Sequence, residues 1–185
     1  MKVLVACEFS GIVRNEFISR GHRAVSCDLL PTESDYLGGH YMGDVLRIID
    51  SQWDMMIAFP PCTYLASSGA RWWKDRQQEQ QGALQFVRDL MAAPIPRIAV
   101  ENPIGKISTA IRKPDQIIQP WTFGHGETKA TCLWLDGLPK LQPTNIVDGR
   151  VPRVHHESPG PDRWKNRSRT YPGIAKAMAD QWGTI

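Results

Sequence analysis

The chain has 185 residues, a length that suits one α/β domain with a single core. With 42% hydrophobic and 22% charged residues, its composition excludes a disordered chain, and a formal net charge of +3 defines no partner class. Four cysteines without a CxxC pair indicate neither a zinc site nor a disulfide framework. The sequence shows no membrane-length apolar run and no signal peptide, so we expect a cytoplasmic protein that binds no metal.

Strands and helices alternate along the first hundred residues, which predicts a Rossmann-like, mostly parallel sheet. The expected strands, each a short apolar run rich in β-formers, are residues 3–7, 24–27, 54–59, 97–100 and 131–135. The expected helices are residues 12–21, 45–49, 74–91 and 174–182. Pro, Gly and basic residues crowd the segment 136–170, which we expect to be irregular within a single domain of residues 1–185.

Polar groups follow four of the expected strands, namely Glu8, Asp28, Cys62 and Glu101. Ligands bind at the carboxyl ends of strands in parallel α/β sheets, so we expect these groups to share one site. The small-residue turn at residues 9–11 lets a ligand approach the N-terminus of the first helix. Asp28 lies where dinucleotide-type folds place an acid on ribose hydroxyls, although a turn or cap residue would also fit.

Cys62 is the candidate nucleophile. Pro60 and Pro61 cannot join a strand ladder, so they fix a rigid loop that presents the cysteine at the cleft. A thiol there can attack a substrate if its pKa is lowered, whereas a buried structural thiol is the simpler explanation for Cys62 alone. Glu101 adds a carboxyl that suits acid catalysis on a ring nitrogen, unless Glu101-Asn102 only ends a strand.

In this order, these residues resemble the motifs of the DNA cytosine-C5 methyltransferases, particularly small phage-type members. Phe9-Ser10-Gly11 resembles the first cofactor motif, and Pro61-Cys62 and Glu101-Asn102 resemble the two catalytic pairs. The resemblance covers nearly the whole chain and implies an α/β, Rossmann-like S-adenosylmethionine-dependent methyltransferase fold with helices on both sheet faces. It implies S-adenosyl-L-methionine as cofactor, bound by Glu8, Phe9, Ser10, Gly11, Asp28, Leu29, Asp44, Val45 and Pro60.

The implied reaction is methylation of carbon 5 of cytosine in DNA, with the base flipped out of a duplex if the substrate is one. Cys62 would add to carbon 6, and Glu101 would engage N3 and the exocyclic amine while carbon 5 attacks the methyl sulfonium. The residues implied as catalytic are Cys62, Glu101, Asn102 and Lys129. The residues expected to contact the substrate are Pro61, Thr63, Ser68, Thr131 and, in the basic stretch 150–169, Arg163, Lys165 and Arg167.

Three features depart from the family pattern. Val13 and Arg14 stand where the family usually has two glycines. Thr131 stands where a second arginine would contact the cytosine carbonyl, a charge that Lys129 supplies without a bidentate fork. The interval between Trp134 and Thr170 is too short for the large target-recognition domain of the family.

Three alternatives stay open. Without a recognition domain, the same chemistry could act on a free cytosine nucleotide or on single strands. An amino methyltransferase acting on N4 of cytosine or N6 of adenine is disfavoured, because Phe59-Pro60-Pro61-Cys62 lacks the polar first and aromatic fourth residue of that motif. An inactive nucleic-acid-binding module is disfavoured by the presence of both Cys62 and Glu101.

Overall fold

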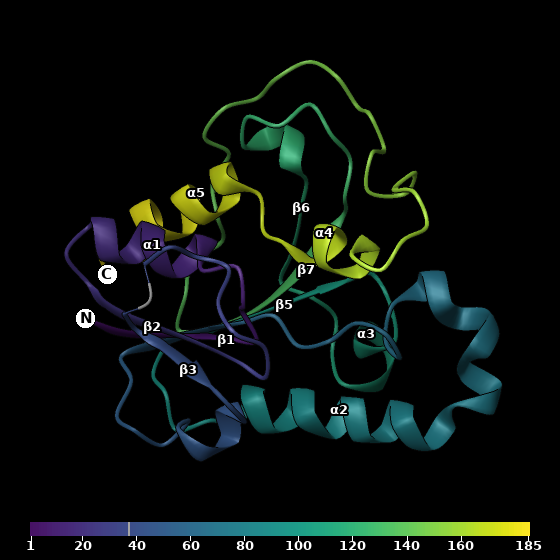
Figure 1. Ribbon diagram of the computed structural model, residues 1–185, viewed down its shortest axis with the longest axis horizontal. Coiled ribbons are helices and arrows are strands. Elements are labelled where there is room, and N and C mark those ends of the chain that lie inside the picture. Colours follow the sequence, from purple (N-terminus) through teal and green to yellow (C-terminus); the bar gives the residue numbers. More distant parts are fainter. Residues whose placement is uncertain (37) are drawn as a thin grey trace.

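The computed structural model describes residues 1–36 and 38–185, and a seven-stranded sheet forms its centre (Figure 1). The sheet order is β3-β2-β1-β4-β5-β7-β6, in which β7 is antiparallel to both its neighbours and every other pairing is parallel. The strands are β1 (Lys2–Ala6), β2 (Arg23–Asp28), β3 (His40–Met42), β4 (Met55–Ala58), β5 (Ile98–Pro103), β6 (Gln116–Ile118) and β7 (Thr131–Asp136).

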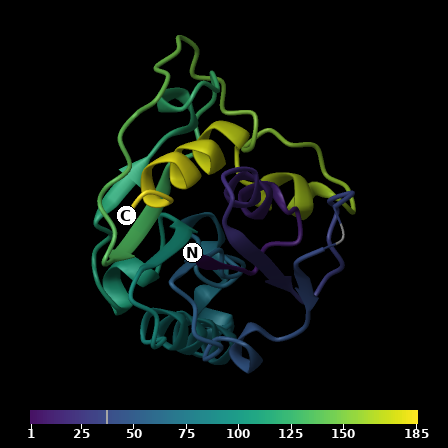
Figure 2. The same ribbon diagram turned by 90° about the vertical axis from the view of Figure 1, so that its left-hand side faces the viewer.

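Helices cover both faces of this sheet: α1 and α5 lie over one face, and α2 lies along the other (Figures 1 and 2). The α-helices are α1 (Ile12–Ser19), α2 (Gln77–Met91), α3 (Ile107–Ala110), α4 (Arg163–Ser168) and α5 (Pro172–Trp182). The 3-10 helices are η1 (Val45–Arg47), η2 (Ser67–Asp75) and η3 (Pro120–Thr122). None of the described helices combines the length and apolar composition that crossing a membrane requires.

The two layers of the core follow from the alternation of side chains along the strands. Val3 and Val5 of β1 pack in the layer with α1 and α5, whereas Leu4 and Ala6 pack in the layer with α2. All four side chains are fully buried, which explains why this strand is a continuous apolar run rather than an alternating one.

The sequence prediction was correct for the five apolar strands and incomplete elsewhere. The three-residue strands β3 and β6 were not predicted. The helix predicted from residue 74 begins at Gln77 as α2, and the residues before it form η2. The segment 136–170 is irregular over residues 137–162, but it was wrongly predicted to lack a helix, because it contains α4.

Candidate active site

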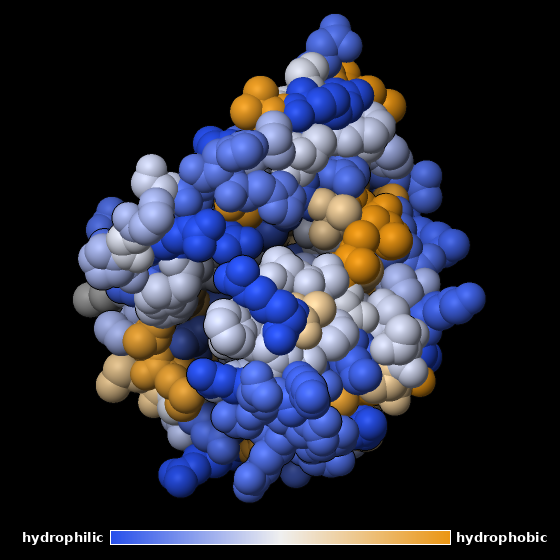
Figure 3. Space-filling model, turned by 90° about the vertical axis from the view of Figure 1, so that its right-hand side faces the viewer, coloured by the Kyte–Doolittle hydropathy of each residue, from blue (hydrophilic) through white to orange (hydrophobic). Residues whose placement is uncertain are grey.

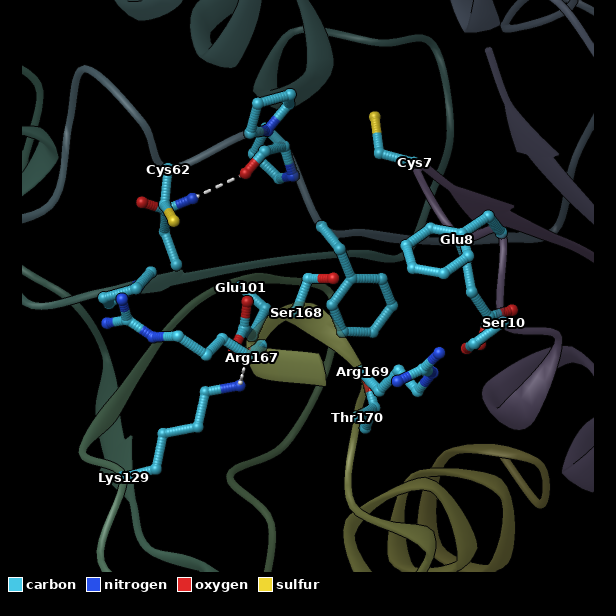
Figure 4. Close-up of a pocket in the computed structure, with 16 residues that line it drawn as sticks. Cys7, Glu8, Ser10, Cys62, Glu101, Lys129, Arg167, Ser168, Arg169 and Thr170 are labelled. Atoms are coloured by element: carbon cyan, nitrogen blue, oxygen red, sulfur yellow. Dashed lines mark hydrogen bonds between the residues drawn. The ribbon is translucent and has the colours of Figure 1, made fainter. Parts of the chain in front are cut away.

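A pocket of about 100 Å³ lies at the carboxyl ends of β1, β4 and β5 (Figure 4). Its remaining walls come from the segment before β7 and from residues 167–170 at the end of α4. Segments from both halves of the chain therefore meet where polar groups following the strands were expected to meet. The sequence-predicted residues that line this pocket are Glu8, Phe9, Ser10, Pro60, Pro61, Cys62, Glu101, Asn102, Lys129 and Arg167.

The other sequence-predicted residues lie outside the wall of this pocket. They are Gly11, Asp28, Leu29, Asp44, Val45, Thr63, Ser68, Thr131, Arg163 and Lys165. Six wall residues were not predicted as site residues: Cys7, Phe59, Pro103, Ser168, Arg169 and Thr170. The basic stretch of the sequence pointed to Arg167 but not to the three residues that follow it.

Hydrogen bonds hold the loop that carries Cys62. The backbone N–H groups of Leu65 and Ala66 donate to the Cys62 carbonyl at 3.0 and 2.9 Å. The Asn102 Nδ2 donates to the Pro60 carbonyl at 2.8 Å, which ties this loop to β5. The Asn102 Oδ1 is buried and has no partner among the described residues, so it remains available to a hydrogen-bond donor.

Opposing charges act on the Cys62 thiol. Desolvation in the pocket and the nearby Glu101 carboxylate raise its pKa above the ordinary value, whereas Lys129 and Arg167 lower it. Burial also raises the pKa of Glu101, while Lys129 and Thr131 favour its charged form. The pocket thus holds a thiol and a carboxyl whose pKa values are both raised by burial, and Lys129 opposes the shift at each group.

The two cations near Cys62, Lys129 and Arg167, come from segments far apart in the sequence. The Lys129 Nζ donates to the Arg167 carbonyl at 2.9 Å, and both side chains are labelled beside Glu101 in Figure 4. The Thr131 hydroxyl donates to the Lys129 carbonyl at 3.1 Å, so it supports this segment from outside the pocket wall. Lys129 therefore links the end of α4 to the segment that leads into β7.

Two thiols line the pocket, and their surroundings differ. Burial and the charges of Asp28, Cys27 and Asp44 raise the pKa of Cys7 far above its ordinary value, and no cation opposes them. Cys62 alone of the two has Lys129 and Arg167 nearby. Cys62 is therefore the better nucleophile of the pocket.

Three residues predicted to bind the cofactor, Asp28, Leu29 and Asp44, lie at or after the carboxyl end of β2, next to β1 in the sheet. Asp28 accepts from the Leu30 N–H at 3.0 Å, and Asp44 caps η1 by accepting from the Leu46 N–H at 3.0 Å. The Gly43 N–H donates to the Asp28 carbonyl at 2.8 Å, which holds Asp44 close to Asp28 at the end of β2. Leu29, which follows Asp28 in the chain, is 76% exposed.

Glu8 holds the N-terminus of α1. Its carboxylate accepts from the backbone N–H of Val13 at 2.6 Å and of Arg14 at 3.2 Å, and the residue is only 4% exposed. Burial raises its pKa to about 7, while these hydrogen bonds favour the charged form. The Glu8 carboxylate is therefore engaged inside the fold, and its predicted cofactor contact stays a prediction.

Three cations of the basic stretch 150–169, namely Arg153, Lys165 and Arg169, pair with carboxylates within the fold. Arg153 contacts Glu127 at 2.9 Å, and both guanidinium ends of Arg169 contact Glu33 at 2.8 Å. The Arg163 Nε donates to the Glu157 carbonyl at 2.8 Å, and Lys165 lies 4.0 Å from Asp162. The carboxylate pairs reduce the charge that the stretch presents to a phosphate backbone, and Arg167 and Arg169 are its basic members that line the pocket.

No protein-family model matches the sequence, and neither does any curated protein. Two solved methyltransferase structures are similar to it. Entamoeba histolytica EhMeth matches with a TM-score of 0.53 and 14% identity, over 80% of this chain and 57% of that chain. Dnmt2 of S. pombe matches with a TM-score of 0.52 and 11% identity, over 84% and 54%.

The likeness confirms the predicted Rossmann-like methyltransferase fold, with its mostly parallel sheet and helices on both faces. This chain spans little more than half the length of either similar protein.

Proposed function

We propose that this protein transfers a methyl group from S-adenosylmethionine to carbon 5 of cytosine in DNA, with Cys62 as the nucleophile. One observation carries the proposal: Cys62, Glu101, Lys129 and Arg167 line the same pocket at the carboxyl edge of the sheet. A thiol, a carboxyl whose pKa is raised and nearby cations are groups that suit nucleophilic addition to a pyrimidine.

The cofactor would lie beside this pocket, at the ends of β1 and β2. Asp28 ends β2, and Asp44 follows Gly43, whose N–H donates to the Asp28 carbonyl; carboxylates at such strand ends suit ribose hydroxyls and a base edge. The exposed Leu29 side chain offers an apolar surface for a planar ring. When bound, S-adenosylmethionine supplies an electrophilic methyl group.

Cys62 activates the ring. Its thiolate forms a bond to carbon 6, the electron pair of the C5–C6 double bond moves toward N3, and Glu101 holds a proton at N3. Carbon 5 thereby becomes electron-rich and would form its bond to the methyl carbon as the bond between that carbon and the sulfonium sulfur breaks, which would release S-adenosylhomocysteine. Loss of the C5 proton to a base then restores the double bond and expels the Cys62 thiolate.

Lys129 and Arg167 affect the ionisation of the Cys62 thiol, which is also coupled to the Glu101 carboxyl. Because both cations lower the pKa of Cys62, they increase the fraction of reactive thiolate in a pocket that otherwise disfavours it. A protonated Glu101 no longer opposes the thiolate by its charge, so the proton that serves N3 also eases ionisation of Cys62. The two groups are therefore expected to work as a coupled pair.

Nucleoside mass spectrometry after incubation of DNA with labelled cofactor tests the proposal. We expect labelled 5-methylcytosine from the wild-type protein and none from Cys62→Ser, which should remain folded and bind S-adenosylhomocysteine. A 5-fluorocytosine substrate should leave an adduct on the Cys62 peptide, because fluorine is not lost as a proton is. An adduct on Cys7, or N4-methylcytosine as product, would contradict the mechanism.

A free cytosine nucleotide is the second candidate substrate. The short irregular segment 137–162 favours this substrate. The segment lies where the DNA cytosine-C5 methyltransferases hold a large target-recognition domain. Deoxycytidine monophosphate supplied under the same conditions distinguishes the two. Methylation of the nucleotide but not of DNA would refute the DNA substrate while leaving the role of Cys62 intact.

A further inference from the structure

Aromatic side chains are exposed on η2, directly after the loop that carries Cys62. Trp72 is 57% exposed, and none of the nine residues of η2 is buried. Runs of 3-10 helix this long are uncommon, and this one carries two adjacent tryptophans, Trp72 and Trp73. Such side chains are frequent where a protein binds a partner through stacking.

Two grooves border this segment and share Trp73. One, of about 280 Å³, lies between η2 and the Cys62 loop and is lined by Thr63, Tyr64, Gly69, Trp72, Trp73 and Arg76. The other, of about 580 Å³, is lined by Trp73, Lys74, Lys106 and glutamines of the first turns of α2. The first groove is mainly aromatic, whereas the second offers amide and ammonium groups.

Cations lie over the aromatic rings. Arg71 lies 5.1 Å from the Trp72 ring centre, Arg76 lies 5.9 Å from that of Tyr64, and Lys106 lies 5.5 Å from that of Trp73. We define these six residues together with Lys74 as the η2 face. Among the residues that the structure describes, the only ion pair on this face joins Arg76 to Glu79, at 4.0 Å. The η2 face therefore keeps most of its positive charge available, unlike the stretch 150–169.

Figure 3 views the molecule from the side on which η2 lies in Figure 1. Strongly hydrophilic side chains surround pale ones of intermediate hydropathy there, and the surface is hollowed near its centre. A large apolar patch would suit a hydrophobic protein partner. A mixture of aromatic rings and cations in grooves instead suits bases and phosphates.

We propose that the η2 face binds the unpaired bases that flank the target cytosine, so that the preferred substrate is single-stranded nucleic acid. The inference rests on the proposed function, because it requires that the nucleic-acid strand passes from the Cys62 pocket onto the η2 face. Thr63 follows Cys62 directly and lines the aromatic groove, so a flanking nucleotide can reach that groove. Bases stack on Tyr64, Trp72 and Trp73, and Lys74 and Lys106 hold phosphates.

Fluorescence anisotropy of a labelled, cytosine-containing oligonucleotide of about 12 nucleotides tests this, since single-strand binders cover sites of this order. The strand is offered as DNA, as RNA and as a DNA duplex of the same sequence. We expect both single strands to bind more tightly than the duplex, and the difference between DNA and RNA identifies the sugar. Trp72→Ala should weaken single-strand binding by roughly 5- to 150-fold, and Trp72→Phe should retain most of the affinity.

Trp121→Ala is the matched control, because Arg150 lies 3.8 Å from the centre of its ring but neither groove includes it. It should bind the single strand as the wild-type protein does. Unchanged binding in Trp72→Ala, or an equal loss in Trp121→Ala, would overturn the inference. Circular dichroism checks that the variants fold.

Methylation of the same strands separates this inference from the proposed function. Methylation by the wild-type protein with unaltered binding in Trp72→Ala would refute the η2 face alone. Binding that depends on Trp72, without methylation of any strand, would refute the proposed function and leave the surface in place.

Discussion

Glu8 should make the stability of the fold fall between acid and neutral pH. Burial raises its pKa from an ordinary 4.5 to about 7, against two backbone hydrogen bonds that favour the charged form. At about 1.4 kcal/mol for each pKa unit, ionising Glu8 costs the folded state about 3 kcal/mol. Because the folded-state pKa lies above the unfolded value, this stability is present below pH 4.5, declines toward pH 7 and levels off beyond it.

Glu8→Gln removes this titration. The amide oxygen can still accept from the Val13 N–H, but the amide nitrogen cannot accept from the Arg14 N–H, a loss of about 1 kcal/mol at every pH. The difference in unfolding free energy between the two proteins should therefore change by about 3 kcal/mol from about pH 4 to pH 8.

Urea denaturation of both proteins across this range measures the difference, with the exposed Glu79→Gln as control. Parallel pH profiles would refute the reasoning. They would mean that the hydrogen bonds and the N-terminus of α1 outweigh burial and keep Glu8 charged.

Further perturbations test the two ends of the site and the loop between them. Asp28→Ala should weaken S-adenosylhomocysteine binding by about 1–3 kcal/mol in calorimetry if Asp28 binds the ribose, whereas the exposed Asp136→Ala should not. Lys129→Met should raise the pKa of both Cys62 and Glu101, so iodoacetamide should alkylate Cys62 only at higher pH than in wild type or in Lys140→Met. Gly105→Ala places a Cβ 2.0 Å from the Leu65 carbonyl oxygen and should cost about 1–3 kcal/mol of stability, measured by urea denaturation, whereas Gly82→Ala meets nothing within 4 Å and should be neutral or stabilising.

The elements that the sequence predicts are those with a local cause. The residues of β1 and β4 are apolar on both faces because both faces are covered. Each strand can therefore be recognised in the sequence as a continuous apolar run. β3 has no such run: its three residues pair with β2, and none of them is buried. η2 carries no buried residue, so the sequence has no apolar periodicity from which this helix could be predicted.

Some residues of the candidate site could be predicted from the sequence and others could not, for the same reason. Cys62 and Glu101 could be found because they follow apolar strands whose carboxyl ends meet by the rules of parallel sheets. That Arg167 and Arg169 both reach the pocket, and that Arg169 also pairs with Glu33, depends on contacts between residues distant in the sequence. The irregular segment before α4 has no periodic pattern from which its path could be inferred.

Arg14 fixes the turn at the start of α1 through contacts with residues distant in the sequence. Gly11 retains a left-handed backbone, with φ at 72°, and a Cβ there would lie 2.8 Å from an Arg14 guanidinium nitrogen. Arg14 is fully buried, and its guanidinium donates to the Ser26 hydroxyl at 3.0 Å and to the Tyr36 carbonyl at 2.9 Å. The Arg14 side chain thus ties α1 to β2 and to the loop after it. Because these contacts fix the turn, we expect its approach to a ligand to depend on Gly11 and on the strand ends.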